Sequence, residues 1–406
     1  MNKSTLYITY DGLTDPLGKA QIIPYLISIS QHPRKLIVLS FEKKELSFKI
    51  NSTKKILDSY NIIWVHLNFS NKFKIISKII DLIKILFLSF YLTIRHKVKI
   101  IHGRGSLPSF YGYLIKKIFN LKLIFDCRGL WADERVDNNS WDLNRKIYNF
   151  IYKLFKKIEN LLFRNSDAII VLTNNIVSYL DIKYNKISDN IFSIPCCVDY
   201  EVFNENLSFD KVKFMNDEFG ISDYQYIFYY SGSLGGIYQL EKMLDFFKVI
   251  NNSFPKTYFL FFTPNIKILQ KELLKKKYDT CKNNIKFKNL DRKDLPKFIS
   301  LCDMMIYFIK PTFSKRASCP TKLGESLSLG VPIITNSGIG DIDQIFEKIK
   351  PGFLFQDLNN VNFQNFIKYI EEIKEINGSD LRDRSKFFFD IKIANRLYKK
   401  VYAKIG

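Results

Sequence analysis

Short apolar runs rich in β-branched and aromatic residues recur along the whole chain, and helix-length segments separate them. The runs show no polar alternation, which is typical of parallel strands buried on both faces of a sheet. Strands that alternate with helices predict doubly wound α/β domains. The runs lie at 6–9, 36–41, 62–69, 98–102, 123–126, 169–172, 191–195, 226–230, 257–262, 284–287, 304–308, 331–335 and 352–355.

A chain of 406 residues is too long for a single hydrophobic core and favours two domains. We predict a Rossmann-like domain over residues 1–200 and a second one over 201–385. A basic helix over 386–406 is expected to cross back to the first domain. Open α/β sheets bind ligands at the carboxyl ends of their strands. Two such domains facing each other would therefore share a cleft at those ends.

Residues 318–335 read Ser-Cys-Pro-Thr-Lys-Leu-Gly-Glu-Ser-Leu-Ser-Leu-Gly-Val-Pro-Ile-Ile-Thr and predict a short helix followed by a buried strand. Ser318 is expected to cap the helix start, whose free amides favour an anion such as phosphate. Lys322 can reach that phosphate. Thr321 and Glu325 share a face, and a carboxylate suits a pair of sugar hydroxyls. The pattern indicates a nucleotide-sugar site, although an ordinary amphipathic helix with solvated charges fits the same residues.

The net charge is +22, and the first half of the chain carries the larger share. Two basic and apolar stretches, 72–96 and 145–157, fit helices that rest on an anionic membrane surface. The first begins with Lys72 and Lys74, and its most apolar part is far shorter than the roughly 20 residues that span a bilayer. Two core-packing helices with solvated lysines, or a Lys-rich composition throughout, remain alternatives. No nucleic-acid-binding motif is present, so nucleic acid is not an expected partner.

The chain opens directly on a strand-like run, and its six cysteines have neither metal-ligand nor disulfide-framework spacing. We therefore expect a cytoplasmic protein with reduced thiols, without a metal site or a cofactor. Together with the basic stretches, this predicts a peripheral protein on the inner face of the cell membrane.

Three stretches resemble bacterial glycosyltransferases of the GT-B fold, within family GT4. They are residues 10–21, 125–135 and 314–325, and with the order of strands the resemblance covers essentially the whole chain. The resemblance implies two Rossmann-like domains facing a cleft. The first domain would bind the acceptor and the second a nucleotide-sugar donor.

The same resemblance implies an activity. It points to a retaining hexosyl- or N-acetylhexosaminyltransferase that uses a nucleotide diphosphate sugar, most simply a UDP-sugar. The acceptor would be a saccharide or a polyprenyl-diphosphate-linked saccharide in surface polysaccharide synthesis. Two rival functions remain: a nucleotide-sugar 2-epimerase of the same fold, and a catalytically degenerate scaffold at the membrane.

The chain departs from the family pattern in its donor half. Glu325 matches the second of the family's two glutamates, whereas the first would fall at Ala317. The loop over 231–238 carries Ser233 and Tyr238 where the family has Arg and Lys. We expect a cation among Lys315, Arg316 and Lys322 to stabilise the leaving diphosphate as a catalytic residue. Donor contacts are also expected from Gly232, Ser233, Gly235, Ser318 and Thr321.

In the first half, Arg128 stands where many relatives have an active-site histidine. Its guanidinium is expected to contact a sugar hydroxyl or a phosphate, although an ion pair with Asp133 or Glu134 is the alternative. Gly18, in the family's first glycine loop, is expected to let the backbone approach the donor. Arg104 follows another strand and is a candidate contact for an acceptor diphosphate.

Overall fold

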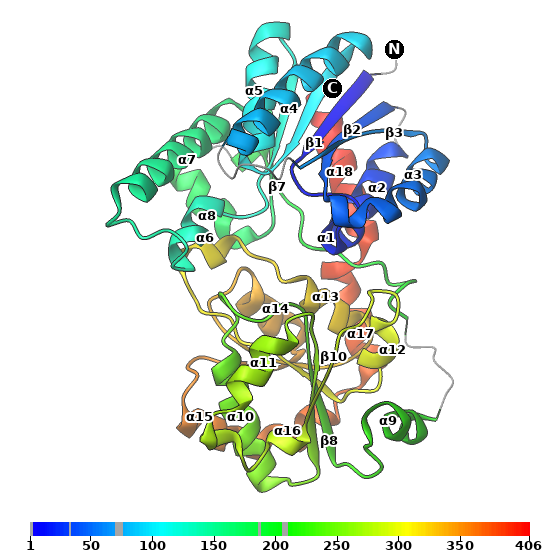
Figure 1. Cartoon of the computed structure of the whole chain (residues 1–406), viewed down its shortest axis with the longest axis vertical. Coiled ribbons are helices and arrows are strands. Elements are labelled where there is room, and N and C mark those ends of the chain that lie inside the picture. Colours follow the sequence, from blue (N-terminus) through cyan, green and yellow to red (C-terminus); the bar gives the residue numbers. More distant parts are fainter. Residues whose placement is uncertain (1–2, 32–33, 70–75, 186–187, 205–209) are drawn as a thin grey trace. The chain divides into compact units, whose positions relative to one another are not determined.

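The fold is built on two parallel sheets, one in each half of the chain (Figure 1). The computed structural model describes residues 3–31, 34–69, 76–185, 188–204 and 210–406. Unit 1 comprises residues 1–197, 313–318 and 391–406, and unit 2 comprises 198–312 and 319–390. The segment 313–318, which the sequence analysis assigned to the second domain, therefore clusters with unit 1.

Unit 1 holds a seven-stranded sheet in the order β3-β2-β1-β4-β5-β6-β7, with parallel neighbours throughout. One hydrophobic core joins the sheet to α4, α5, α7 and α8, and a second joins it to α2, α3 and α18. Figure 1 shows α2 and α18 next to each other. The strands are β1 (Lys3–Thr9), β2 (Arg34–Glu42), β3 (Ile62–Asn68), β4 (Val98–Arg104), β5 (Lys122–Asp126), β6 (Ala168–Val171) and β7 (Ile191–Ser193). The helices are α1 (Pro16–Gln21), α2 (Ile23–Ser30), η1 (Lys44–Lys49), α3 (Ile50–Ser59), α4 (Ile76–Arg95), α5 (Ser106–Phe119), α6 (Trp131–Asp137), α7 (Lys146–Asn165), α8 (Asn174–Tyr184), η2 (Ser188–Asn190), η5 (Phe313–Ala317) and α18 (Ile391–Ile405).

Unit 2 holds a six-stranded parallel sheet in the order β10-β9-β8-β11-β12-β13, with one large aromatic-rich core. Its strands are β8 (Tyr226–Ser231), β9 (Thr257–Phe262), β10 (Ile285–Lys288), β11 (Met304–Ile306), β12 (Ile333–Asn336) and β13 (Gly352–Phe355). Its helices are α9 (Lys211–Phe219), α10 (Leu240–Ser253), α11 (Ile266–Leu273), η3 (Lys276–Tyr278), η4 (Lys282–Asn284), α12 (Leu295–Ile299), α13 (Thr321–Ser328), α14 (Ile342–Ile349), α15 (Asn360–Phe366), η6 (Ile367–Tyr369), α16 (Ile370–Lys374) and α17 (Gly378–Phe389).

The predicted doubly wound architecture is confirmed, since each apolar run forms a strand with small differences at its ends. Strand β8 shows why the prediction succeeds, because all of its residues are buried and both of its faces are apolar. The stretch at 72–96 forms α4, although Lys72 and Lys74 lie outside the described residues. The stretch at 145–157 forms the first part of α7.

The register of the first sheet brings charged residues together at its carboxyl edge. Arg104 ends β4 and lies beside Asp126, which ends β5, and beside Thr9 at the end of β1. Parallel strands end at one edge of a sheet, so charged side chains from different strands meet there. This edge carries the polar network of unit 1.

Candidate functional site

The loop after β8 in unit 2 is built from glycines in conformations that other residues rarely adopt. Gly232, Gly235 and Gly236 have φ values of +115°, +91° and +63°. A glycine in this region costs no steric strain and leaves the backbone open to close approach. Tyr230 stabilises the loop, because its hydroxyl donates to the Ser233 carbonyl at 2.5 Å. These residues could therefore contact a ligand through main-chain atoms.

Helix α13 begins at Thr321, and Pro320 at its N-cap provides no side-chain hydrogen bond. The expectation that Ser318 caps this helix is therefore wrong. Ser318 belongs to unit 1, where its hydroxyl lies 3.4 Å from Lys315 Nζ. Because no side chain caps α13, its first amides can serve an anion.

The ammonium group of Lys322 lies inside a cage of three tyrosines, Tyr230, Tyr238 and Tyr307. Its Nζ donates to the Tyr230 hydroxyl at 3.0 Å and lies 3.7 Å from the centroid of the Tyr238 ring. The Tyr230 and Tyr307 centroids are 4.2 Å and 5.8 Å away. A Cβ added to Gly232 would lie 3.4 Å from Lys322 Nζ. The cage therefore fixes this cation against the glycine loop, through both a hydrogen bond and cation–π contacts.

Burial lowers the pKa of the Lys322 side chain to about 7, although the nearby Glu325 carboxylate acts in the opposite direction. Desolvation disfavours the charged form of a lysine, and a nearby anion restores it. An incoming diphosphate would be such an anion. The site is therefore suited to gain positive charge when a phosphate group binds.

Glu325 lies one turn after Lys322 on α13, and it is buried. Its Oε1 accepts a hydrogen bond from Nη1 of Arg292, which follows β10 and whose guanidinium lies 5.1 Å from the ring centroid of Phe203. The ion pair fixes the orientation of the carboxylate. An ionised carboxylate has further acceptor positions, so Oε2 can still accept from sugar hydroxyls. Sequence reasoning missed Arg292, because nothing in its local sequence links it to a helix 33 residues away.

The other two candidate cations belong to unit 1, whereas Lys322 belongs to unit 2. Lys315 is buried and forms an ion pair with Glu134 at 2.9 Å. Arg316 is exposed, and its backbone carbonyl accepts from Thr173 Oγ1 at 2.6 Å. Ala317 is buried in the core that unit 1 forms with α4, α5, α7 and α8. Of the three expected cations, the structure brings only Lys322 to the glycine loop within unit 2.

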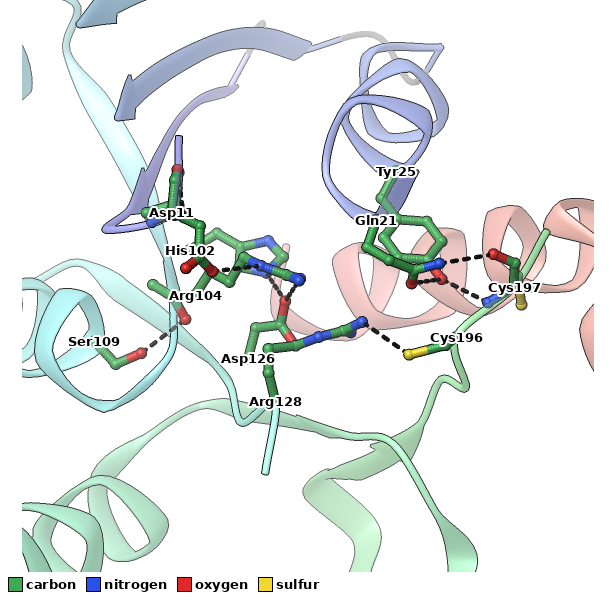
Figure 2. A network of polar contacts seen from close by, with 12 residues as sticks. Asp11, Gln21, Tyr25, His102, Arg104, Ser109, Asp126, Arg128, Cys196 and Cys197 are labelled. Carbon is green, nitrogen blue, oxygen red and sulfur yellow. Dashed lines mark hydrogen bonds and ion pairs between the residues drawn. The ribbon is translucent and has the colours of Figure 1, made fainter. Parts of the chain in front are cut away.

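Unit 1 contains an arginine cluster, formed by Arg104, Asp126 and Arg128 (Figure 2). Oδ1 of Asp126 lies 3.4 Å from Nη1 of Arg128, and its Oδ2 lies 3.5 Å from Nη1 of Arg104. The alternative partners for Arg128, Asp133 and Glu134, are therefore not the ones observed. Both arginines share one buried carboxylate. Asp11 also lies 3.6 Å from Arg104 Nε, so two carboxylates balance the two guanidinium groups, whose N–H donors can still bind an anion or the oxygens of a sugar.

Neighbouring groups fix the charge states in this cluster. Burial alone would raise the pKa of Asp126, but Arg128, His102 and Arg104 hold it well below its usual value. Burial lowers the pKa of His102, so this ring is neutral at pH 7. The His102 Nδ1 lies 2.8 Å from the hydroxyl of Tyr402 on α18. Arg128 Nη2 also lies 3.9 Å from Cys196 Sγ.

Gly18 has a packing role in the first glycine loop. A Cβ there would lie 2.1 Å from the Gly12 carbonyl, so any side chain would push α1 away from this loop. The amides of Leu13 and Thr14 donate to the buried carboxylate of Glu42 at 2.8 and 3.0 Å. Those two amides are therefore already occupied. The group that approaches Gly18 closely is therefore the backbone at Gly12 and Leu13.

Comparisons with known proteins bear on the family and the fold of the chain. Residues 53–202 match the model of Glycosyltransferase Family 4. No curated protein matches the sequence. The structure of Anabaena HepE in complex with UDP-glucose has a TM-score of 0.71 at 13% identity, over 98% of this chain and 99% of that one. At this identity, the likeness shows the fold alone.

Two further structures share the fold. Sucrose-phosphate synthase from Thermosynechococcus elongatus has a TM-score of 0.68 at 13% identity, over 99% of this chain and 100% of that one. A structure from Listeria monocytogenes, described as a UDP-N-acetylglucosamine 2-epimerase, has a TM-score of 0.62 at 11% identity, over 99% and 96%. These findings agree with the resemblance to family GT4: residues 53–202 match the family model, and the whole chain shares the fold of these solved structures.

Proposed function

We propose that the protein is a glycosyltransferase that uses a nucleotide diphosphate sugar, most simply a UDP-sugar, as its donor. The observation that carries the proposal is the position of Lys322 against Gly232, beside the uncapped start of α13. A diphosphate would bind to Lys322 Nζ, to the first amides of α13 and to the loop at Gly232–Gly235. Glu325, oriented by Arg292, would accept hydrogen bonds from the ribose hydroxyls. Anabaena HepE, which shares the fold, forms a complex with UDP-glucose, and this supports a donor of the same class.

The proposed reaction replaces one bond at the anomeric carbon by another. The bond from this carbon to the diphosphate oxygen breaks, and UDP leaves with the bonding electrons. The acceptor hydroxyl oxygen forms the new bond, its proton passes to the leaving diphosphate, and the configuration is retained. Lys322 and the amides of α13 would stabilise the negative charge that develops on the leaving diphosphate. Loss of one such preorganised donor typically costs about 100- to 1,000-fold in rate.

The tyrosine at position 238 supports the assignment of Lys322. The family places a cation in this loop, whereas here Tyr238 packs its ring 3.7 Å from Lys322 Nζ. The cation thus enters from α13, and Tyr238 helps to hold it. We propose that Lys322 replaces the loop cations and that Lys315 and Arg316 play no direct part in donor binding.

For the acceptor, we propose a polyprenyl-diphosphate-linked saccharide of surface polysaccharide synthesis, bound by unit 1. Arg104 and Arg128 share the buried Asp126 carboxylate, and their guanidinium N–H groups would donate to the acceptor diphosphate. Such an acceptor lies in a membrane, which requires a protein at the inner face of the cell membrane. Either a hexose or an N-acetylhexosamine fits this scheme as the transferred sugar.

The test is a panel of UDP-, GDP- and dTDP-sugars, assayed with a synthetic polyprenyl-diphosphate disaccharide. We expect one UDP-sugar to release UDP and to extend the acceptor, as seen by mass spectrometry. Glu325→Ala should raise the donor KM strongly, whereas Glu347→Ala, an exposed glutamate on α14, should not. An unchanged donor KM in Glu325→Ala would refute the ribose contact. Conversion of a UDP-sugar without acceptor would identify an epimerase, and no turnover or UDP binding would identify a scaffold.

A further inference from the structure

Helix α4 of unit 1 presents an apolar face to solvent. This face, called here the α4 face, includes Phe87, which is 71% exposed, Ile94, which is 56% exposed, and Tyr91, which is 51% exposed. The spacing of three and four residues places its members on one side of the helix. The α4 face consists of Ile80, Ile83, Phe87, Phe90, Tyr91 and Ile94.

The opposite side of α4 packs on the sheet, and it is partly polar. Asp81, Ser89 and Thr93 are buried there together with Ile85 and Leu92. A surface helix of a soluble protein normally buries its apolar side and exposes its polar side. In α4 the buried side mixes these polar residues with apolar ones, and Leu82, Leu86 and Leu88 pack against the same core. Phe87, Tyr91 and Ile94 nevertheless stay largely exposed, so they are available for a contact outside the fold.

The apolar surface continues onto α5 and has a basic border. The Phe90 ring lies 5.0 Å from that of Phe119, and the neighbouring Ile118 is 65% exposed. Figure 1 shows α4 and α5 side by side in unit 1. Exposed basic residues border this surface at Lys84, Arg95, Lys97 and Lys117.

Helix α7 repeats the arrangement on the same side of the sheet. Ile147, Phe150 and Leu154 are exposed among Lys146, Lys153 and Lys157. Because α4, α5 and α7 share one core on one face of the sheet, their outer sides belong to the same side of unit 1. Among the helices of the described ranges, none is both long and apolar enough to cross a bilayer.

We propose that the α4 face inserts into the headgroup region of an anionic lipid bilayer, with α7 as a second contact. A contiguous apolar surface with a basic border fits a helix that lies in the plane of the interface. The net charge of +22 provides the complementary charge for anionic lipids. The proposed purpose of this contact, which is to bring unit 1 to a lipid-linked acceptor, rests on the proposed function, whereas the binding to lipid itself does not.

The experiment is co-sedimentation of the full chain with vesicles of phosphatidylcholine and phosphatidylglycerol, and with phosphatidylcholine alone. We expect binding to the anionic vesicles, weakened but not abolished by 1 M NaCl, because apolar insertion is not screened by salt. The double variant Phe87→Asp/Ile94→Asp should bind about tenfold more weakly or worse. The matched control is Leu274→Asp/Phe387→Asp in unit 2, whose two side chains are each 82% exposed, and it should bind as the wild type does.

Thermal stabilisation by UDP is measured for each variant and reports on its fold and its donor site. A variant that fails to fold is thereby distinguished from one that only loses vesicle binding. The proposal is overturned if the wild type does not bind anionic vesicles, or if the α4 double variant binds as tightly as the wild type. It is also overturned if light scattering shows that the α4 substitutions only dissociate a dimer, because the face would then bind a second copy of the chain. Vesicle binding without UDP binding would refute the proposed function and leave this surface standing.

Discussion

Binding of UDP should take up a proton at Lys322, and the affinity should therefore fall as the pH rises. In the free protein, burial lowers the pKa of Lys322 to about 7. A diphosphate beside the ammonium group favours its charged form and raises the pKa in the complex. Above pH 7 the complex thus holds more protons than the free protein, and a higher pH favours dissociation.

The size of the effect follows from the fraction of free protein that carries a charged Lys322. This fraction falls from about one half at pH 7 to about 1% at pH 9, so the apparent Kd for UDP should rise about 50-fold over this range. At pH 8, binding should take up on the order of 0.9 proton. The tyrosine cage provides the structural reason, since it surrounds the ammonium group with rings.

Isothermal titration with UDP at pH 6, 7, 8 and 9, in buffers of different ionisation enthalpy, measures both quantities. Lys322→Met is the control, because it keeps the length of the side chain and removes the charge. The variant should bind UDP more weakly at pH 7, with a much smaller dependence on pH. A Kd that stays constant between pH 7 and 9 in the wild type, or the same slope in both proteins, would refute the role of Lys322.

Three further predictions concern the residues around the two clusters. Arg292→Ala should raise the Kd for UDP about tenfold, since a charge-assisted bond that orients Glu325 is lost. Arg292→Lys should restore part of the lost affinity. An unchanged Kd for Arg292→Ala in the titration would count against the orienting role. Asp126→Asn should lower the free energy of unfolding by about 3–5 kcal/mol, because two buried arginines lose their shared carboxylate. Since the pKa of Asp126 is depressed in the folded state, the stability difference between the wild type and Asp126→Asn should persist at neutral pH and shrink below about pH 4. Urea unfolding at several pH values measures it. A stability loss below about 1 kcal/mol at neutral pH would contradict the prediction. Transferase activity should survive EDTA, because Lys322 and the amides of α13 provide the positive charge; abolition by the chelator, reversed by a divalent cation, would show that a metal is needed.

The sheets and part of the donor half were predictable from local sequence. Buried parallel strands need apolar residues on both faces, so their runs are visible without any knowledge of long-range contacts. Glycines after a strand and a short helix with Lys322 and Glu325 are likewise local patterns. These residues lie in one unit because the loop after β8 and the start of α13 both belong to the carboxyl edge of the second sheet.

The pairing of charges was not predictable, because tertiary structure determines it. Lys315 pairs with Glu134, which is 181 residues away, and therefore clusters with unit 1. Arg128 pairs with Asp126 rather than with Asp133 or Glu134, and the register of β4 and β5 places Arg104 beside the same carboxylate. The predicted cap failed for a related reason, since the hydroxyl of Ser318 lies beside Lys315.

Helix α4 shows a further limit. Its sequence predicts a helix with apolar and polar residues, but only the structure shows which side packs on the sheet. Asp81 and Ser89 are buried, whereas Phe87 and Ile94 are exposed, contrary to the usual arrangement at these positions. Periodicity alone does not show which side of the helix is buried.

The most direct test of the donor site is a crystal structure of the protein with UDP. The account predicts the diphosphate within hydrogen-bonding distance of Lys322 Nζ and the first amides of α13, with the ribose hydroxyls on Glu325. UDP bound away from α13, or a diphosphate without contact to Lys322, would contradict it.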